Sequence, residues 1–189
     1  MKKSVITFGI ILFITAVGIS QETALTQVSG NLTVYGTSNL HDWDVKAEKI
    51  SGSTVFTIEE GSLKTIDKLN FSVVAESLKS GKSGMDKNTY AALNTKTHKN
   101  ITYRLTKVSK ITETAANTYK VETTGELFIA GITKNVVISF TAKISGNKLS
   151  LSGIVPIDMI HYGIEPPKAL MGSIKTGKDV RIEFNVEYK

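Results

Sequence analysis

The chain has 189 residues, a length that fits one domain, and a formal net charge of +6. It contains no cysteine, which excludes disulfides, thiol catalysis and thiolate zinc sites. Its lysines are scattered, and its only arginines are Arg104 and Arg181, so it lacks the clustered basic surface of a nucleic-acid-binding protein. The lysines are interpreted as a solvated outer surface, with weak attraction to anionic lipid head groups as a second interpretation.

The first twenty residues have the pattern of a secretory signal peptide. Two lysines at positions 2 and 3 precede an apolar run over Val5–Ile19, and Gly18 and Ser20 suit the −3 and −1 positions of a cleavage site. The run is shorter than the roughly 20 residues that a membrane-spanning helix needs. We therefore expect residues 1–20 to be removed, a mature protein that begins at Gln21, and a periplasmic or secreted location.

Residues 21–189 are expected to form one domain dominated by β-strands. The segment Gln21–Gln27 has no periodicity and is predicted to be a loose arm. Apolar and polar side chains then alternate around residues 32–36, 43–48, 55–58 and 69–74, and this period of two predicts four strands.

The alternation stops after residue 76. The segment Ser77–Lys87 is rich in serine, glycine and lysine, and Met85, Tyr90 and Leu93 then have helix-like spacing. With Asp86 as the N-cap, the sequence predicts one short helix over Asp86–Leu93. Its apolar stripe would cover an opening in the sheet.

Strand patterns return in the second half of the chain. They lie around residues 101–105, 119–129, 136–142, 149–153 and 180–188, with turns at 130–135 and 146–147 and a less regular segment at 157–178. In the last strand, apolar residues from Val180 to Tyr188 occupy every second position. About eight or nine short strands joined by turns favour an all-β barrel or sandwich.

Four motifs stand in a characteristic order. They are Gly36–Trp43, Met85-Asp86 with a helix end at Ala92-Leu93 and the strand start Lys99–Tyr103, Gly125–Lys134, and Ile157–Ile164. Together they resemble the YceI-like family of secreted bacterial polyisoprenoid-binding proteins, over about Val28–Tyr188. Asn100 departs from the commoner pattern of that family.

The resemblance implies an extended, lipocalin-like antiparallel β-barrel of about eight strands with a short helical insertion. It implies a non-enzymatic protein that holds a polyisoprenoid, of quinone or polyprenyl type, in the lumen for transport, storage or sequestration. No cofactor and no nucleic acid are expected, and transient contact with the membrane or with a cytochrome b561-type membrane protein is implied. A barrel of about eight strands is just wide enough to be filled by its side chains or to hold one slender ligand.

The candidate ligand-binding residues are the apolar side chains expected to face the lumen or its rim. They are Trp43, Val45, Leu69, Phe71, Val73, Met85, Tyr90, Leu93, Ile101, Tyr103, Leu127, Ile129, Ile138, Phe140, Met159, Ile182 and Phe184, with Met171 as a further rim residue. The same side chains could instead fill a solid core. The protein would then be an envelope stress or adhesion module that binds a partner on its outer face.

The three histidines suggest a third interpretation. His41, His98 and His161 lack the i, i+4 pairing of a helical metal site, and no metal is expected. An enzyme that uses His41 with a nearby carboxylate stays open as an alternative. His41-Asp42 is otherwise expected to form hydrogen bonds that fix the strand corner.

Overall fold

The computed structural model describes residues 20–189. The signal peptide predicted for residues 1–20 lies outside the described residues except for Ser20. Within residues 20–189, none of the helices has the length and apolar character needed to cross a membrane.

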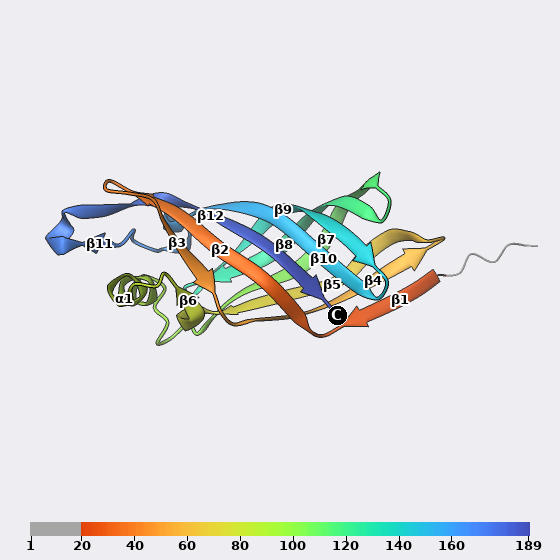
Figure 1. Ribbon diagram of the computed structural model, residues 1–189, viewed down its shortest axis with the longest axis horizontal. Coiled ribbons are helices and arrows are strands. Elements are labelled where there is room, and N and C mark those ends of the chain that lie inside the picture. Colours follow the sequence, from red (N-terminus) through yellow and green to blue (C-terminus); the bar gives the residue numbers. More distant parts are fainter. Residues whose placement is uncertain (1–19) are drawn as a thin grey trace, which may run out of the picture.

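The described chain is an elongated, curled antiparallel sheet with one short α-helix (Figure 1). Its strands are β1 (Ser20–Leu25), β2 (Val28–Ser38), β3 (Trp43–Ala47), β4 (Ile50–Glu59), β5 (Ser62–Val74), β6 (Leu78–Lys79), β7 (Asn100–Ala115), β8 (Thr118–Ile129), β9 (Ile132–Ser145), β10 (Lys148–Asp158), β11 (Lys168–Ala169) and β12 (Ile174–Tyr188). The helices are η1 (Ala75–Ser77), α1 (Ser83–Ala92), η2 (Met159–Tyr162) and η3 (Leu170–Gly172). The predicted all-β class, antiparallel barrel and helical insertion are confirmed.

The sheet closes into a barrel because β1 continues along the chain into β2, and β3 continues into β4. The hydrogen-bonded order is β1-β4-β5-β7-β8-β9-β10-β12-β2-β3-β6. Thr33 of β2 pairs with Lys46 of β3, and Leu25 of β1 pairs with Thr54 of β4, so both ladders follow one register. The long strand β1–β2 therefore lies against the long strand β3–β4, and the two ends of the path meet.

The twelve strand segments between residues 20 and 189 correspond to about eight long strands. The pairs β1–β2, β3–β4 and β5–β6 are each one bent strand, and β11 is a two-residue segment paired with β12. The bends account for the difference from the predicted count, because a barrel strand that curves this strongly loses its ladder locally.

The prediction of a loose arm over Gln21–Gln27 is wrong, because most of this segment forms β1. Residues Ser20–Leu25 pair with β4 from Glu59 to Thr54, and Leu25 is buried. Leu25 is the only large apolar residue of this strand, so no alternation was visible. The strand is stabilised by backbone hydrogen bonds along the edge of β4 and by this one anchor.

The predicted helix exists but begins earlier than expected. Helix α1 covers Ser83–Ala92, and its N-cap is Lys82. Asp86, predicted as the N-cap, lies inside the first turn. Its carboxylate accepts hydrogen bonds from the backbone N–H of Ser80 at 2.8 Å and from the Ser80 hydroxyl at 2.6 Å. The carboxylate thus fixes the loop that precedes the helix, which is a task similar to that of a cap.

The hydrogen bonds of Asp86 predict that its contribution to the free energy of unfolding depends on pH. The hydrogen bonds from Ser80 hold the pKa of this carboxyl below its ordinary value, helped by Lys79. A lowered pKa means that the stabilisation is present above the unfolded pKa of about 3.9 and is lost as the pH falls through the folded value. We expect Asp86→Ala to lower the free energy of unfolding by about 1 kcal/mol or more at pH 7.

Thermal melts of the wild type and Asp86→Ala at pH 7 and at acid pH measure this effect. The difference between the two proteins should narrow as the pH falls below about 4. Asp44→Ala is the matched control, since Asp44 is an exposed aspartate on β3. A difference that stays constant across this pH range would contradict the assignment.

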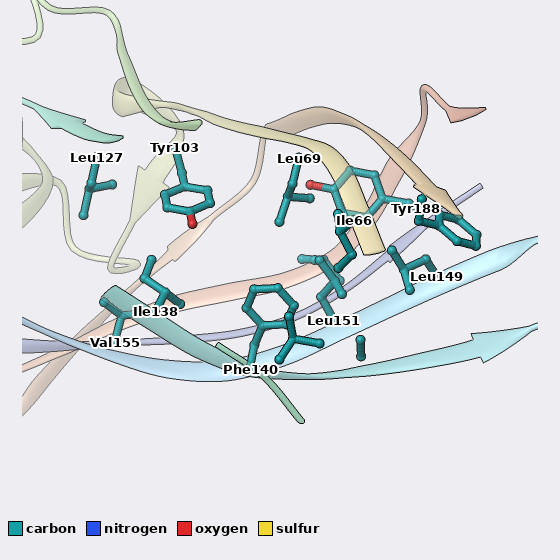
Figure 2. Close-up of a cluster of buried hydrophobic side chains, with 14 of the residues drawn as sticks. Ile66, Leu69, Tyr103, Leu127, Ile138, Phe140, Leu149, Leu151, Val155 and Tyr188 are labelled. Carbon is teal, nitrogen blue, oxygen red and sulfur yellow. The ribbon is translucent and has the colours of Figure 1, made fainter. Parts of the chain in front are cut away.

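The buried core is densest at the end of the barrel that carries β1 and the β4–β5, β7–β8 and β9–β10 turns (Figure 1). We call this region the packed end and define it by Leu25, Phe56, Ile66, Tyr119 and Leu149, which are all buried. Figure 2 shows the cluster extending from Leu149 and Tyr188 to Tyr103 and Leu127. Helix α1, β11 and the β2–β3 corner lie at the opposite end of the barrel (Figure 1).

Candidate functional site

Two adjoining cavities occupy the part of the barrel beyond the packed end. The inner cavity has a volume of about 130 Å³, and the outer cavity, beneath α1 and η3, has about 740 Å³. Five side chains line both: Val34, Leu78, Ile101, Ile129 and Ile182. These five residues, which we call the junction, stand between the two cavities, and we call the two adjoining cavities together the channel.

The inner cavity is apolar. Its polar side-chain groups are the hydroxyls of Thr102, Tyr103 and Tyr188. The Tyr103 hydroxyl lies 3.0 Å from the Thr123 hydroxyl, and the Tyr188 hydroxyl donates to the Asn70 carbonyl at 3.1 Å. Burial raises the pKa of both phenols, so both stay neutral. Apolar cavities of roughly 150 Å³ stay dry and accept a group about the size of benzene.

Glycines let two aromatic rings lie along the wall of the barrel. A Cβ atom at Gly125 would come within 2.5 Å of the Tyr103 ring, and one at Gly36 within 2.1 Å of the Trp43 ring. Each ring therefore lies flat where a side chain would otherwise stand. The result is open space in the lumen where a projecting aromatic ring would block it.

The outer cavity combines apolar walls with a basic mouth. Its polar lining includes Lys82, Lys87 and Lys168, together with His41 and Asn88. Among the described residues, no aspartate or glutamate lines either cavity. An apolar chain with a neutral or anionic end group would fit this distribution of polarity and charge.

The structure brings most of the predicted site residues together around the channel. The inner cavity is lined by Leu69, Phe71, Val73, Tyr103, Leu127, Ile138, Phe140 and Phe184, and the junction includes Ile101, Ile129 and Ile182. The outer cavity is lined by Trp43, Val45, Met85, Leu93 and Met159, and also by Met171.

Tyr90 is the exception, because it lines neither cavity. Its hydroxyl lies 2.6 Å from Lys79 Nζ and hydrogen-bonds the carbonyls of Glu76 and Leu78. Tyr90 therefore ties α1 to β6 and to the turn before it.

Several lining residues were not among the candidates. The further inner residues are Leu32, Val34, Leu78, Thr102, Leu151, Val155, Val186 and Tyr188. Val186 and Tyr188 continue the alternation of Ile182 and Phe184, so that periodicity could have identified them. Leu78 had no such signal, since it lies in the segment rich in serine, glycine and lysine.

The β2–β3 corner is held mainly by Ser38. Its hydroxyl accepts from the backbone N–H of Leu40 and His41 and donates to the His41 carbonyl at 2.7 Å. His41 Nδ1 lies 2.7 Å from the Asp42 carbonyl oxygen. Trp43, which follows, donates its indole N–H to the Thr37 carbonyl at 2.9 Å.

His98 and Asp158, two further polar residues weighed as site candidates, contact groups other than His41. His98 packs edge-on against Phe128 with ring centroids 5.8 Å apart. Asp158 accepts from the N–H of Ile160 and from Lys178, and Lys178 holds the pKa of Asp158 below its ordinary value. Within residues 20–189, no three or more His, Asp or Glu side chains form a group that could hold a metal ion.

Comparison with known proteins gives a family match and several similar structures. A family model described as "YceI-like domain" matches residues 42–188. A search of curated proteins finds no match. The fold is similar to that of a polyisoprenoid binding domain from Saccharophagus degradans implicated in plant cell wall breakdown, with a TM-score of 0.67 and 12% identity over 89% of this chain and 99% of that chain.

Two further solved structures share the fold. Burkholderia cenocepacia BcnA has a TM-score of 0.66 and 16% identity, over 85% of this chain and 96% of that chain. The Campylobacter jejuni YCEI protein has a TM-score of 0.55 and 16% identity, over 100% of this chain and 99% of that chain.

Proposed function

Because the chain belongs to the YceI-like domain family, we propose that it is a lipid-binding protein whose barrel holds a polyisoprenoid chain. The proposal is one of binding without catalysis and without a cofactor. Transport, storage or sequestration of the lipid would follow from the same site. The ligand would be of quinone or polyprenyl type, and the protein would act in the periplasm or after secretion.

The channel, whose walls are mostly apolar, is the observation that carries this proposal. The outer cavity, of about 740 Å³, lies within the roughly 300–1,000 Å³ range of small-molecule sites. The channel narrows to the inner cavity, of about 130 Å³, which suits the slender end of a chain. Ten methylene-sized groups buried along the two cavities together would contribute about 8 kcal/mol before the cost of ordering the chain.

The neighbour from Saccharophagus degradans supports the choice of an isoprenoid, since that protein is described as a polyisoprenoid binding domain. A solid scaffold that binds partners only on its outer face would not need the outer cavity. The enzyme alternative finds less support, because His41 Nδ1 contacts a backbone carbonyl and not a carboxylate.

Analysis of the lipid that accompanies the protein tests the proposal. Native mass spectrometry of the purified protein should show a bound species, and organic extraction should release a polyisoprenoid. Lipid-stripped protein should take up an octaprenyl-like chain again. A protein that is free of lipid and takes up no such chain would overturn the proposal.

Trp43 gives a second readout of lipid uptake. It is the single tryptophan of the chain, is half-buried and lines the outer cavity. We expect its emission to shift to shorter wavelength when a polyisoprenoid fills the cavity, because hydrocarbon replaces water next to the ring. The measurement is a fluorescence titration of lipid-stripped protein with a short isoprenoid.

Trp43→Phe is the control for this titration, since it should remove the signal and keep the uptake measured by mass spectrometry. Uptake of lipid by the wild type with unchanged Trp43 emission would place the ligand outside the outer cavity.

A further inference from the structure

Three large apolar side chains stand exposed at the mouth of the channel. Leu40, Leu170 and Met171 have 64%, 72% and 107% of their surface exposed. Leu40 belongs to the β2–β3 corner, whereas Leu170 and Met171 belong to η3 and also line the outer cavity. We call these three residues the docking tip.

Hydrogen bonds hold the two segments of the docking tip side by side. The side chain of Asn39 donates to the Ser173 carbonyl at 2.9 Å and accepts from the Lys175 N–H at 2.7 Å. The backbone N–H of Asn39 also donates to the Lys175 carbonyl at 3.1 Å. The corner that carries Leu40 is thus fixed to the segment that follows η3 (Figure 1).

The backbone of η3 is unusual for exposed apolar residues. Leu170 and Met171 both have positive φ angles, of 48° and 55°. For non-glycine residues this left-handed conformation costs about 1–2 kcal/mol each. Backbone strain of this kind clusters at functional sites.

A set of lysines surrounds the docking tip. Lys82, Lys87 and Lys168 line the mouth, and Lys175 is exposed next to Asn39; we call these four residues the lysine rim. The nearby opposing charges are Glu165, which pairs with Lys168 at 2.9 Å, Asp42 of the corner, and Asp86 of α1, whose buried carboxylate is hydrogen-bonded to Ser80. Lys82 and Lys87 form no ion pair with any residue between 20 and 189.

We propose that the docking tip and the lysine rim bind the surface of an anionic lipid bilayer. Apolar side chains that enter the interfacial region, surrounded by lysines that contact lipid phosphates, are the pattern of reversible membrane binding. Three side chains give too little area for a protein partner, since a stable interface needs about 800 Å² per partner. The complementarity between the positive lysine rim and the negative lipid phosphates therefore favours a bilayer as the partner.

The inference extends the proposed function. The mouth of the channel would face the bilayer, and a lipid chain would pass between membrane and lumen without exposure to water. Each methylene group kept out of water on this path saves about 0.8 kcal/mol.

Vesicle co-sedimentation tests the docking surface. The wild type and all variants are purified in the form that the expressing cell produces. Mass spectrometry of each protein establishes that all of them have the same N-terminus. Vesicles of phosphatidylglycerol with phosphatidylcholine should bind it, and vesicles of phosphatidylcholine alone should bind it much less. Raising the salt from about 0.05 M to about 0.5 M should release it.

Variants separate the apolar and the charged contributions. L170S/M171S should lower the partition coefficient by about a hundredfold, since burying each of the two apolar side chains is worth about one decade. K82E/K87E should lower it by at least about tenfold. The matched controls V137S/I154S, on the exposed outer wall, and K110E/K143E, near the packed end, should bind as the wild type does.

The outcomes separate this inference from the proposed function. Wild-type protein that ignores anionic vesicles, or tip variants that bind like the wild type, would overturn the docking inference. L40S and K175E change a tip residue and a rim residue that line neither cavity, so both should weaken vesicle binding and still allow uptake of a detergent-dispersed isoprenoid. A protein that binds vesicles but takes up no isoprenoid would contradict the proposed function alone.

Discussion

Replacing Phe56 by alanine is expected to lower the free energy of unfolding by about 3–5 kcal/mol. Phe56 is 1% exposed and belongs to the packed end, where it pairs across the sheet with Ile66. Neither cavity reaches its ring, so its removal creates a new void in a filled region. For a chain of this length the melting temperature should fall by about 6–20 °C.

Phe71→Ala is the matched control, because Phe71 already borders the inner cavity. It removes the same atoms from a ring that is only half-buried, so its cost should fall below about 3 kcal/mol. Chemical denaturation of both variants gives the comparison. Lipid binding should respond in the opposite order, with Phe71→Ala altering affinity and Phe56→Ala leaving it unchanged. Equal costs would contradict the division between the packed end and the part of the barrel that holds the cavities.

The alternation of apolar and polar residues could not predict which inward side chains pack tightly and which line a cavity. A period of two assigns Ile182, Phe184, Val186 and Tyr188 to one face of the last strand, and the structure places all four on the cavity wall. The structure also buries Phe56 on an inward face, although no cavity reaches it. Whether an inward side chain packs or borders a cavity depends on the side chains that face it across the barrel. The sequence of one strand does not determine them.

Other parts of the site depend on contacts between distant segments. Asn39 and Lys175 lie far apart in the sequence, and their hydrogen bonds assemble the docking tip. Gly36 and Gly125 belong to two of the sequence motifs, but residue spacing does not predict the aromatic rings that lie over them. Local patterns predicted the barrel and most of its lining, while the shape of the lumen came from these long-range contacts.

A tryptophan at position 34 is expected to close the channel at its junction. Val34 lies between Val45 of β3 and Ile182 of β12 and lines both cavities. The larger indole should fill the junction and keep a lipid chain out of the inner cavity. Each methylene excluded loses about 0.8 kcal/mol, so a few of them raise the Kd by more than about tenfold. Mass spectrometry of bound lipid measures the loss.

The control for Val34→Trp is Val137→Trp, which adds the same ring to an exposed position of β9. Overpacking at position 34 costs about 1–3 kcal/mol, so a melting curve must first establish that the variant is folded. Ile101→Trp approaches the junction from β7 and serves as a second blocking variant if the first does not fold. If a folded junction variant carries as much lipid as Val137→Trp, the chain cannot pass through the junction. The ligand would then lie wholly in the outer cavity, and the inner cavity would belong to the core.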